Sequence, residues 1–273
     1  MKKILFFLLA AIAPLAVNAQ VNIMSFNIRY GTAPDGTNSW RYRAGAVLKM
    51  IEDQAPDVIG MQEALNEQVR FLDEFTNGYD WVGVGRDDGR KDGEYMAIFY
   101  NKKRISVLKW GTFWLSETPD KPSLGWDAAC RRTATWAFMK DKKTGRKFLM
   151  VNTHLDHVGE QARDNGAALI LEKISSINKQ GIPVVLTGDM NSTSADKALR
   201  HFEANFLNAR ANAVSSDLGG TFHDWGKVKS PDAIDHIYYR GWSSCTRFEV
   251  VRTPYEGRTF VSDHYPIKAT LVF

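Results

Sequence analysis

Short apolar runs that stop at Asn, Asp, Glu or His constrain the fold of this chain more than any other feature. Each run has the length and composition of a buried strand, so the polar residue beside it is expected where a strand meets a loop. Any one of these endings is explained by a helix cap, a turn or a core histidine. Coincidence is a poor explanation for six of them: Asn27, Gln62-Glu63, Asn152-Thr153-His154, Asp189-Met190-Asn191, Asp235-His236 and Asp263-His264.

Strand-like and helix-like segments alternate in both halves of the chain, with hairpins between them. Helical spacing of apolar residues predicts helices over 40–53, 67–75, 160–178 and 194–202. Strands are expected over 21–26, 57–61, 79–84, 95–100, 105–113, 131–139, 147–153, 184–187, 233–239, 245–251 and 265–273. This order predicts an α/β sandwich of two sheets with helices outside. No repeat or low-complexity linker divides residues 20–273, so one domain is expected there.

The first nineteen residues have the pattern of a secretory signal peptide. A basic start, Met1-Lys2-Lys3, precedes an apolar run and the small-residue site Val17-Asn18-Ala19. We therefore expect an exported protein, periplasmic or extracellular, whose mature part begins at Gln20 and has no transmembrane segment. In such a compartment Cys130 and Cys245 are either bridged or free thiols.

The charge gives little information about the partner. The formal net charge is +4, and removal of the signal peptide's two lysines reduces it to about +2. Domains that bind long nucleic acids usually carry clustered basic residues and a larger excess of positive charge. Charge alone therefore leaves the kind of partner open. The sequence indicates no protein partner.

Carboxylates and amides without thiolates form an oxygen-rich set that suits Mg²⁺ or Mn²⁺. Glu63 is the strongest single candidate for a metal ligand. Asp189 is placed to position an attacking water, with Asn191 and His154 donating to the phosphate oxygens. In His264 an imidazole stands beside a carboxylate, an arrangement that holds and moves a proton.

The order of these motifs resembles the endonuclease/exonuclease/phosphatase superfamily over almost the whole mature chain. The resemblance implies a four-layered α-β-β-α sandwich with two mixed, mostly antiparallel sheets, and metal-dependent hydrolysis of a phosphoester. It implies that Asn27 and Asp263 lie near the metal held by Glu63, and that Asp235 orients His264. Ile28-Arg29-Tyr30 lacks the acidic residue of the DNA-repair members. Glu94-Tyr95 and His154 are more similar to the deadenylase- and nocturnin-like branch, which includes exported bacterial members.

Four residues are candidates for substrate binding. Trp40 is suited to stacking on a base or sugar, although half-buried packing explains such a residue equally well. Arg131 is suited to a second phosphate or a carboxylate. Tyr95 and His223 complete the set.

The leading hypothesis is thus an exported Mg²⁺-dependent phosphoester hydrolase. Within it, the near-neutral charge favours a small phosphorylated substrate, with nucleic acid as the alternative. An exoribonuclease-like nuclease and a non-catalytic binding module with the same fold are the alternatives. A third alternative is a zinc hydrolase of the metallo-β-lactamase type, since His154-Leu155-Asp156-His157 resembles the end of its metal motif. That motif's first ligand would fall on Asn152, which disfavours it.

Overall fold

Two β-sheets lie face to face in a computed structural model that describes residues 20–273. The predicted signal peptide, residues 1–19, lies outside the described residues. The seven-stranded sheet has the order β10 (Ala213–Ser216), β12 (Ser244–Val250), β13 (Ile267–Val272), β1 (Gln20–Asn27), β2 (Val58–Gln62), β4 (Ile98–Asn101) and β3 (Tyr79–Val82). The six-stranded sheet has the order β5 (Ile105–Trp114), β6 (Thr133–Asp141), β7 (Lys147–His154), β8 (Val184–Asp189), β11 (Asp235–Arg240) and β9 (Leu207–Asn208).

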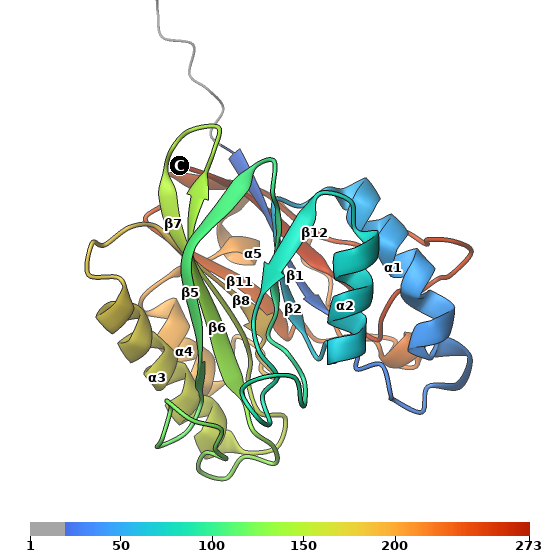
Figure 1. Cartoon of the computed structure of the whole chain (residues 1–273), viewed down its shortest axis with the longest axis horizontal. Helices are drawn as coiled ribbons and strands as arrows, with labels where there is room; N and C mark the ends of the chain where they lie inside the picture. Colours follow the sequence, from blue (N-terminus) through green and yellow to red (C-terminus); the bar gives the residue numbers. More distant parts are fainter. Residues whose placement is uncertain (1–19) are drawn as a thin grey trace, which may run out of the picture.

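Helices cover the outer faces of both sheets (Figure 1). Apolar side chains of α1 (Trp40–Gln54) and α2 (Asn66–Phe75) pack on the seven-stranded sheet. Those of α3 (Glu160–Ile177) and α4 (Lys197–Glu203) pack on the six-stranded sheet. The predicted four-layered α-β-β-α sandwich with mixed sheets is therefore confirmed.

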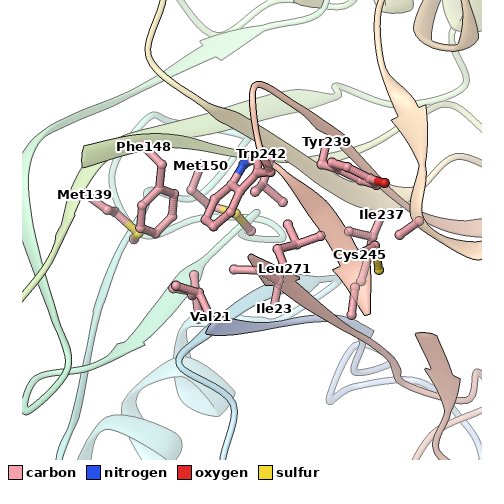
Figure 2. Packing of buried hydrophobic residues seen from close by; sticks show 14 of the residues in the cluster. Val21, Ile23, Met139, Phe148, Met150, Ile237, Tyr239, Trp242, Cys245 and Leu271 are labelled. Atoms are coloured by element: carbon pink, nitrogen blue, oxygen red, sulfur yellow. The ribbon is translucent and has the colours of Figure 1, made fainter. Parts of the chain in front are cut away.

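A third apolar cluster fills the space between the sheets (Figure 2). Val21 and Leu271 from the seven-stranded sheet meet Met150 and Ile237 from the six-stranded sheet. Trp242 packs against Phe273 and Phe148 at one end of this layer. The inner faces of both sheets are thus buried, which holds the sheets at a fixed separation.

Strand direction brings the polar strand ends together. β1 and β2 are parallel, as are β7 and β8, so each pair ends at one edge of its sheet. Asn27 is in register with Gln62, and His154 is in register with Asp189. β11 runs antiparallel to β8, so its first residue, Asp235, lies opposite Asp189.

Buried polar contacts join the two sheets just behind this edge. Asn152 on β7 donates to the carbonyl oxygens of Met61 (2.7 Å) and Ala97 (3.1 Å). Its Oδ1 accepts from Gln62 Nε2 at 2.7 Å. Gly60 permits this approach, because a Cβ there would lie 2.6 Å from Asn152 Oδ1. Asn152 therefore fixes the position of one sheet relative to the other.

The predicted elements agree with the structure except at their ends and in one region. All four predicted helices form, although the last begins at Lys197 rather than at Ser194. The short strands β9 and β10 and the helix α5 (Ala209–Asn212) were not predicted, because too few apolar residues alternate there. Cys130 and Cys245 are free thiols. Within residues 20–273 no helix has the length and apolarity needed to cross a bilayer.

The Asn152 contacts predict a large effect on stability. Asn152→Ala leaves Gln62 Nε2 and the carbonyl of Met61 without these partners in a site closed to water, which costs about 2–3 kcal/mol of unfolding free energy. Urea unfolding monitored by circular dichroism measures it. Asn212→Ala, on an exposed turn of α5, is the control and should change stability by less than about 0.5 kcal/mol. Equal stabilities of the two variants would contradict the role given to Asn152.

Candidate active site

A cavity of about 520 Å³ opens at the edge where the strand ends meet. Its lining combines carboxylates, histidines and arginines with a few apolar side chains: Arg29, Tyr30, Glu63, Arg86, Glu94, Cys130, Arg132, His154, His157, Asp189, Asn191, Phe222, Ile234, Asp263 and His264. Most of the residues predicted for catalysis and metal binding thus face one space. Asn27 and Asp235 contact these residues from behind.

His264 is held as an imidazolium by the carboxylates around it. Its Nδ1 lies 2.8 Å from Asp235 Oδ2, and its Nε2 lies 3.7 Å from Asp189 Oδ2. Burial opposes the positive charge, but Asp235 and Asp189 outweigh it and raise the pKa of His264 to about 10. The carboxylate that orients His264 is therefore Asp235, on another strand, and not its neighbour Asp263.

The pKa of Asp189 is also raised, but for a carboxylate this favours the neutral form. Burial, reinforced by the negative charge of Asp235, raises the pKa of Asp189 to about 7, while His264 and a hydrogen bond from Asn27 oppose the rise. A carboxylate with a pKa near neutrality is suited to exchanging a proton with water. Its Oδ1 also accepts from the backbone N–H of Asn191 at 2.9 Å, which orients the turn after β8.

His154 is neutral. Burial, together with the charges of Arg132 and Arg86, lowers its pKa well below 6.5. Nε2 of His154 lies 2.9 Å from the side-chain amide nitrogen of Asn191 and 3.4 Å from Asp189 Oδ2. The neutral His154 ring and the Asn191 amide therefore lie on the same side of the cavity as the Asp189 carboxylate.

The carboxylates of Glu63 and Asp189 form the part of the site that best suits a divalent cation. Asn27 lies between them, and its amide nitrogen donates to Glu63 Oε1 at 3.0 Å and to Asp189 Oδ2 at 2.9 Å. Ligand atoms of Glu63, His154 and Asp189 lie within 4.8 Å of one another. Two carboxylates that converge on one neutral amide concentrate negative charge, which His264 offsets at Asp189. Their hard oxygen donors fit Mg²⁺ or Mn²⁺.

Asp263 meets an arginine instead. Its Oδ2 lies 3.4 Å from Arg29 Nη1, and its Oδ1 accepts from Ser262 Oγ at 3.2 Å. Burial raises the pKa of Asp263, and the charges of His264 and Arg29 oppose that rise. Asp263 still lines the cavity, which keeps it within the same charged cluster as Glu63.

Three residues near the strand ends adopt left-handed backbone angles. The φ angle is 61° at Arg29 after β1, 63° at Glu63 after β2 and 46° at Asn191 after β8. Residues other than glycine bear a cost on the order of 1–3 kcal/mol in such conformations, which concentrate at functional sites. These sharp turns direct the Glu63 and Asn191 side chains into the cavity.

Comparison with known proteins identifies the family. The sequence profile described as "Endonuclease/Exonuclease/phosphatase family" matches residues 24–264. The chain belongs to the endonuclease/exonuclease/phosphatase family. A Bacteroides vulgatus endonuclease/exonuclease/phosphatase structure is 41% identical, with a TM-score of 0.87, and the match covers 92% of this chain and 98% of that one.

Two further members of the family are similar in different ways. A Bacteroides thetaiotaomicron structure described as a mannosyl-6-phosphatase is 35% identical, with a TM-score of 0.86 and 93% and 100% of the two chains covered. The CCR4-Not complex 3'-5'-exoribonuclease subunit Ccr4 of Debaryomyces hansenii is 23% identical over 255 residues. That match covers 76% of this chain and only 29% of the Ccr4 subunit. The similarity to the deadenylase branch is thus distant.

Tyr95 and Trp40 do not line the cavity of this family member. The Tyr95 ring is buried in the apolar layer between the seven-stranded sheet and its helices. Its hydroxyl accepts a hydrogen bond from Asn66 and donates one to the carbonyl of Arg90. Trp40 packs edge-to-face on Phe71 in the same apolar layer. Apolar packing therefore explains the position of both rings outside the cavity lining.

Arg131 and His223 also lie elsewhere. Arg131 is half-buried and pairs with Asp87 at 3.3 Å. His223 is buried between the rings of Phe260 and Tyr265, behind the loop that carries His264, and burial lowers its pKa to about 4. Neither side chain is among the residues that line the cavity.

Arg86 and Glu94 line the cavity but were not predicted to bind a substrate. Their segment is charged and rich in Gly and Asp, a composition that is typical of a loop. Arg132, which follows the half-buried Arg131, also lines the cavity. His157, which the sequence indicated only as part of the zinc-type motif, lines the cavity too, and its Nδ1 lies 2.9 Å from Arg132 Nη2.

The His264–Asp235 contact predicts a measurable change in titration. Asp235→Asn removes the negative charge that raises the pKa of His264, so the midpoint of its titration should move to lower pH. ¹⁵N NMR of the imidazole, in EDTA, should report a protonated ring at pH 8 in the original protein and a largely neutral one in the variant. Asp164→Asn, which removes a carboxylate 2.9 Å from His201, should leave the His264 curve unchanged. Coincident curves for the Asp235 variant and the original protein would contradict this account.

Proposed function

We propose that this chain is an exported Mg²⁺-dependent hydrolase that removes phosphate from monoesters of small polar molecules. The carrying observation is the convergence of Glu63 and Asp189 on Asn27, beside the His264–Asp235 pair, inside one cavity. Membership in the endonuclease/exonuclease/phosphatase family supports the same chemistry.

The residues of this chain divide the reaction between them. Asp189 accepts the proton of the attacking water, a role that its position in the cavity beside His264 supports. His264, kept protonated by Asp235, donates a hydrogen bond to a phosphoryl oxygen. Asn191 directs its amide to the same side of the cavity and stabilises the negative charge that develops on phosphorus-bound oxygens.

Glu63 and Asp189 would hold the cation, with Asn27 beside them. When bound, Mg²⁺ or Mn²⁺ supplies positive charge to the phosphoryl oxygens and to the leaving oxygen.

Two observations favour a small monoester over a nucleic acid. The mature chain's charge of about +2 is too low to attract a long polyanion. A relative that is 35% identical over nearly its whole length is described as a mannosyl-6-phosphatase, whereas the Ccr4 match covers under a third of that subunit. Phosphorylated sugars are therefore the first substrates to test, with oligoribonucleotides as the competing class.

Removal of the metal or of its main ligand should abolish turnover. EDTA should stop phosphate release from a sugar monophosphate, and added Mg²⁺ or Mn²⁺ should restore it. Glu63→Gln replaces a charged ligand by a neutral one of equal size, so we expect kcat/KM to fall at least about 100-fold. Glu172→Gln, exposed on α3, should retain full activity.

Phosphate release that persists in EDTA, or full activity of Glu63→Gln, would overturn the proposed mechanism. Cleavage of oligoribonucleotides without phosphate release from any monoester would favour the nuclease instead. Absence of turnover on both classes, in a correctly folded protein, would favour the binding module.

Export is tested independently of catalysis. The basic and apolar start of the sequence supports cleavage after Ala19, so chain secreted by a bacterial host should begin at Gln20. Intact-mass measurement of periplasmic and medium fractions identifies the new end. Full-length chain retained in the cytoplasm would contradict export.

A further inference from the structure

The side of the cavity that the proposed chemistry leaves unused carries two arginine–carboxylate pairs. Arg86 Nη1 lies 2.6 Å from Glu94 Oε2, and the two side chains are 12% and 14% exposed. Arg132 Nε lies 3.3 Å from Asp156 Oδ2, and its Nη2 lies 2.9 Å from His157 Nδ1. Arg86, Glu94, Arg132 and His157 all line the cavity that contains Glu63 and His264. We call these four residues the arginine wall.

The chain holds Arg86 and Glu94 in fixed positions. The indole N–H of Trp114 donates to the carbonyl of Arg86 at 2.7 Å, and the N–H of Arg86 donates to the carbonyl of Glu94 at 3.1 Å. The buried hydroxyl of Tyr95 donates to the carbonyl of Arg90 and closes the loop between them. A loop fastened in this way presents preorganised groups to a ligand.

Arg132 is fixed from the other side. Burial would raise the pKa of Asp156, but backbone N–H groups of Gly159, Ala129 and Val158, with the charge of Arg132, bring the pKa below its ordinary value. Asp156 is therefore ionised and holds the guanidinium of Arg132 in place. The Arg132 side chain is only 6% exposed. Burying the Arg132–Asp156 pair costs desolvation free energy, and buried ion pairs contribute little net stability to a fold. Stability alone therefore does not explain why the pair is there.

Charge pairing decides what this wall can recognise. Each guanidinium already faces a carboxylate, so a second phosphate would gain little net attraction here. The Arg86–Glu94 pair leaves hydrogen-bonding capacity unused, because it engages one nitrogen of the guanidinium, Nη1, and one oxygen of the carboxylate, Oε2. Guanidinium donors beside carboxylate acceptors match neighbouring hydroxyl groups, which each donate and accept.

The rest of the lining agrees with a hydroxylated ring. Tyr30 and Phe222 supply apolar surface in the same cavity, and the ring of Phe222 lies 4.9 Å from that of His264. Such surface packs against the C–H faces of a ring, while polar groups opposite fix its orientation. A cavity of about 520 Å³ accommodates one such unit with its phosphate.

We propose that Arg86, Glu94 and Arg132 determine specificity by hydrogen-bonding the hydroxyl groups of a phosphorylated sugar whose phosphate lies at Glu63 and His264. This inference rests on the proposed phosphatase function and names its substrate class. The three residues bind the part of the substrate that does not react. Their loss should therefore weaken turnover of hydroxylated esters and spare esters without hydroxyl groups.

The test compares mannose 6-phosphate with phenyl phosphate, an ester without hydroxyl groups, in the presence of Mg²⁺. Arg86→Met and Glu94→Gln should each lower kcat/KM for mannose 6-phosphate roughly tenfold or more, mainly through KM. The values for phenyl phosphate should change less than about threefold. Arg247→Met and Glu249→Gln each remove one partner of a surface arginine–glutamate pair on β12. These control variants should leave kcat/KM unchanged for both esters.

Thermal unfolding of every variant shows whether a loss of kcat/KM arises from misfolding. Glu94→Gln keeps the shape of the side chain and is therefore the variant expected to disturb folding least. Equal losses on both esters in folded variants would overturn the specificity inference and leave the phosphatase intact. Lack of metal-dependent phosphate release from both esters in the original protein would instead overturn the phosphatase function, and the inference with it.

Discussion

Negative charge gathered at one edge of two stacked sheets is the constraint on which the rest of this structure depends. Asp189, Asp235 and Asp263 are almost fully buried there, and Glu63 is partly buried beside them. Burial of like charges is unfavourable unless positive charge accompanies them. His264 supplies positive charge at Asp235, and Arg29 supplies it at Asp263. The pair Glu63–Asp189 shares the neutral amide of Asn27, and His264 lies 3.7 Å from Asp189 Oδ2, so a divalent cation would compensate the negative charge that remains at Glu63.

The fold produces this cluster by means that are individually ordinary. Parallel pairing carries β1 with β2, and β7 with β8, to a common edge, and antiparallel β11 begins where β8 ends. Asn152 fixes one sheet against the other through buried hydrogen bonds that tolerate little sliding. Left-handed turns at Glu63 and Asn191 then point the side chains into the cavity. The site's geometry thus depends on the core behind it, and loops supply mainly the far wall.

Much of the fold and the central cluster could be predicted from the sequence, because strand periodicity and polar strand ends are local signals. Residues such as Tyr95 show the limit. An aromatic side chain beside a loop has equal reason to face a ligand or the core, and only tertiary packing decides. Arg86 shows the converse: its Gly- and Asp-rich segment has the composition of a mobile loop, yet Trp114 and Tyr95 fasten it. Contacts between residues distant in sequence were beyond local patterns.

Anomalous diffraction from crystals soaked in Mn²⁺ tests the central claim most directly, because it locates the cation without reference to any substrate. The account predicts one strong peak in contact with the carboxylates of Glu63 and Asp189, and its loss in crystals of Glu63→Gln. The group formed by Cys130, Asp156 and His157 is the competing cluster, although Arg132 already contacts two of its members. A peak there, or no peak at Glu63 in a crystal with an open cavity, would contradict the assignment of the metal site.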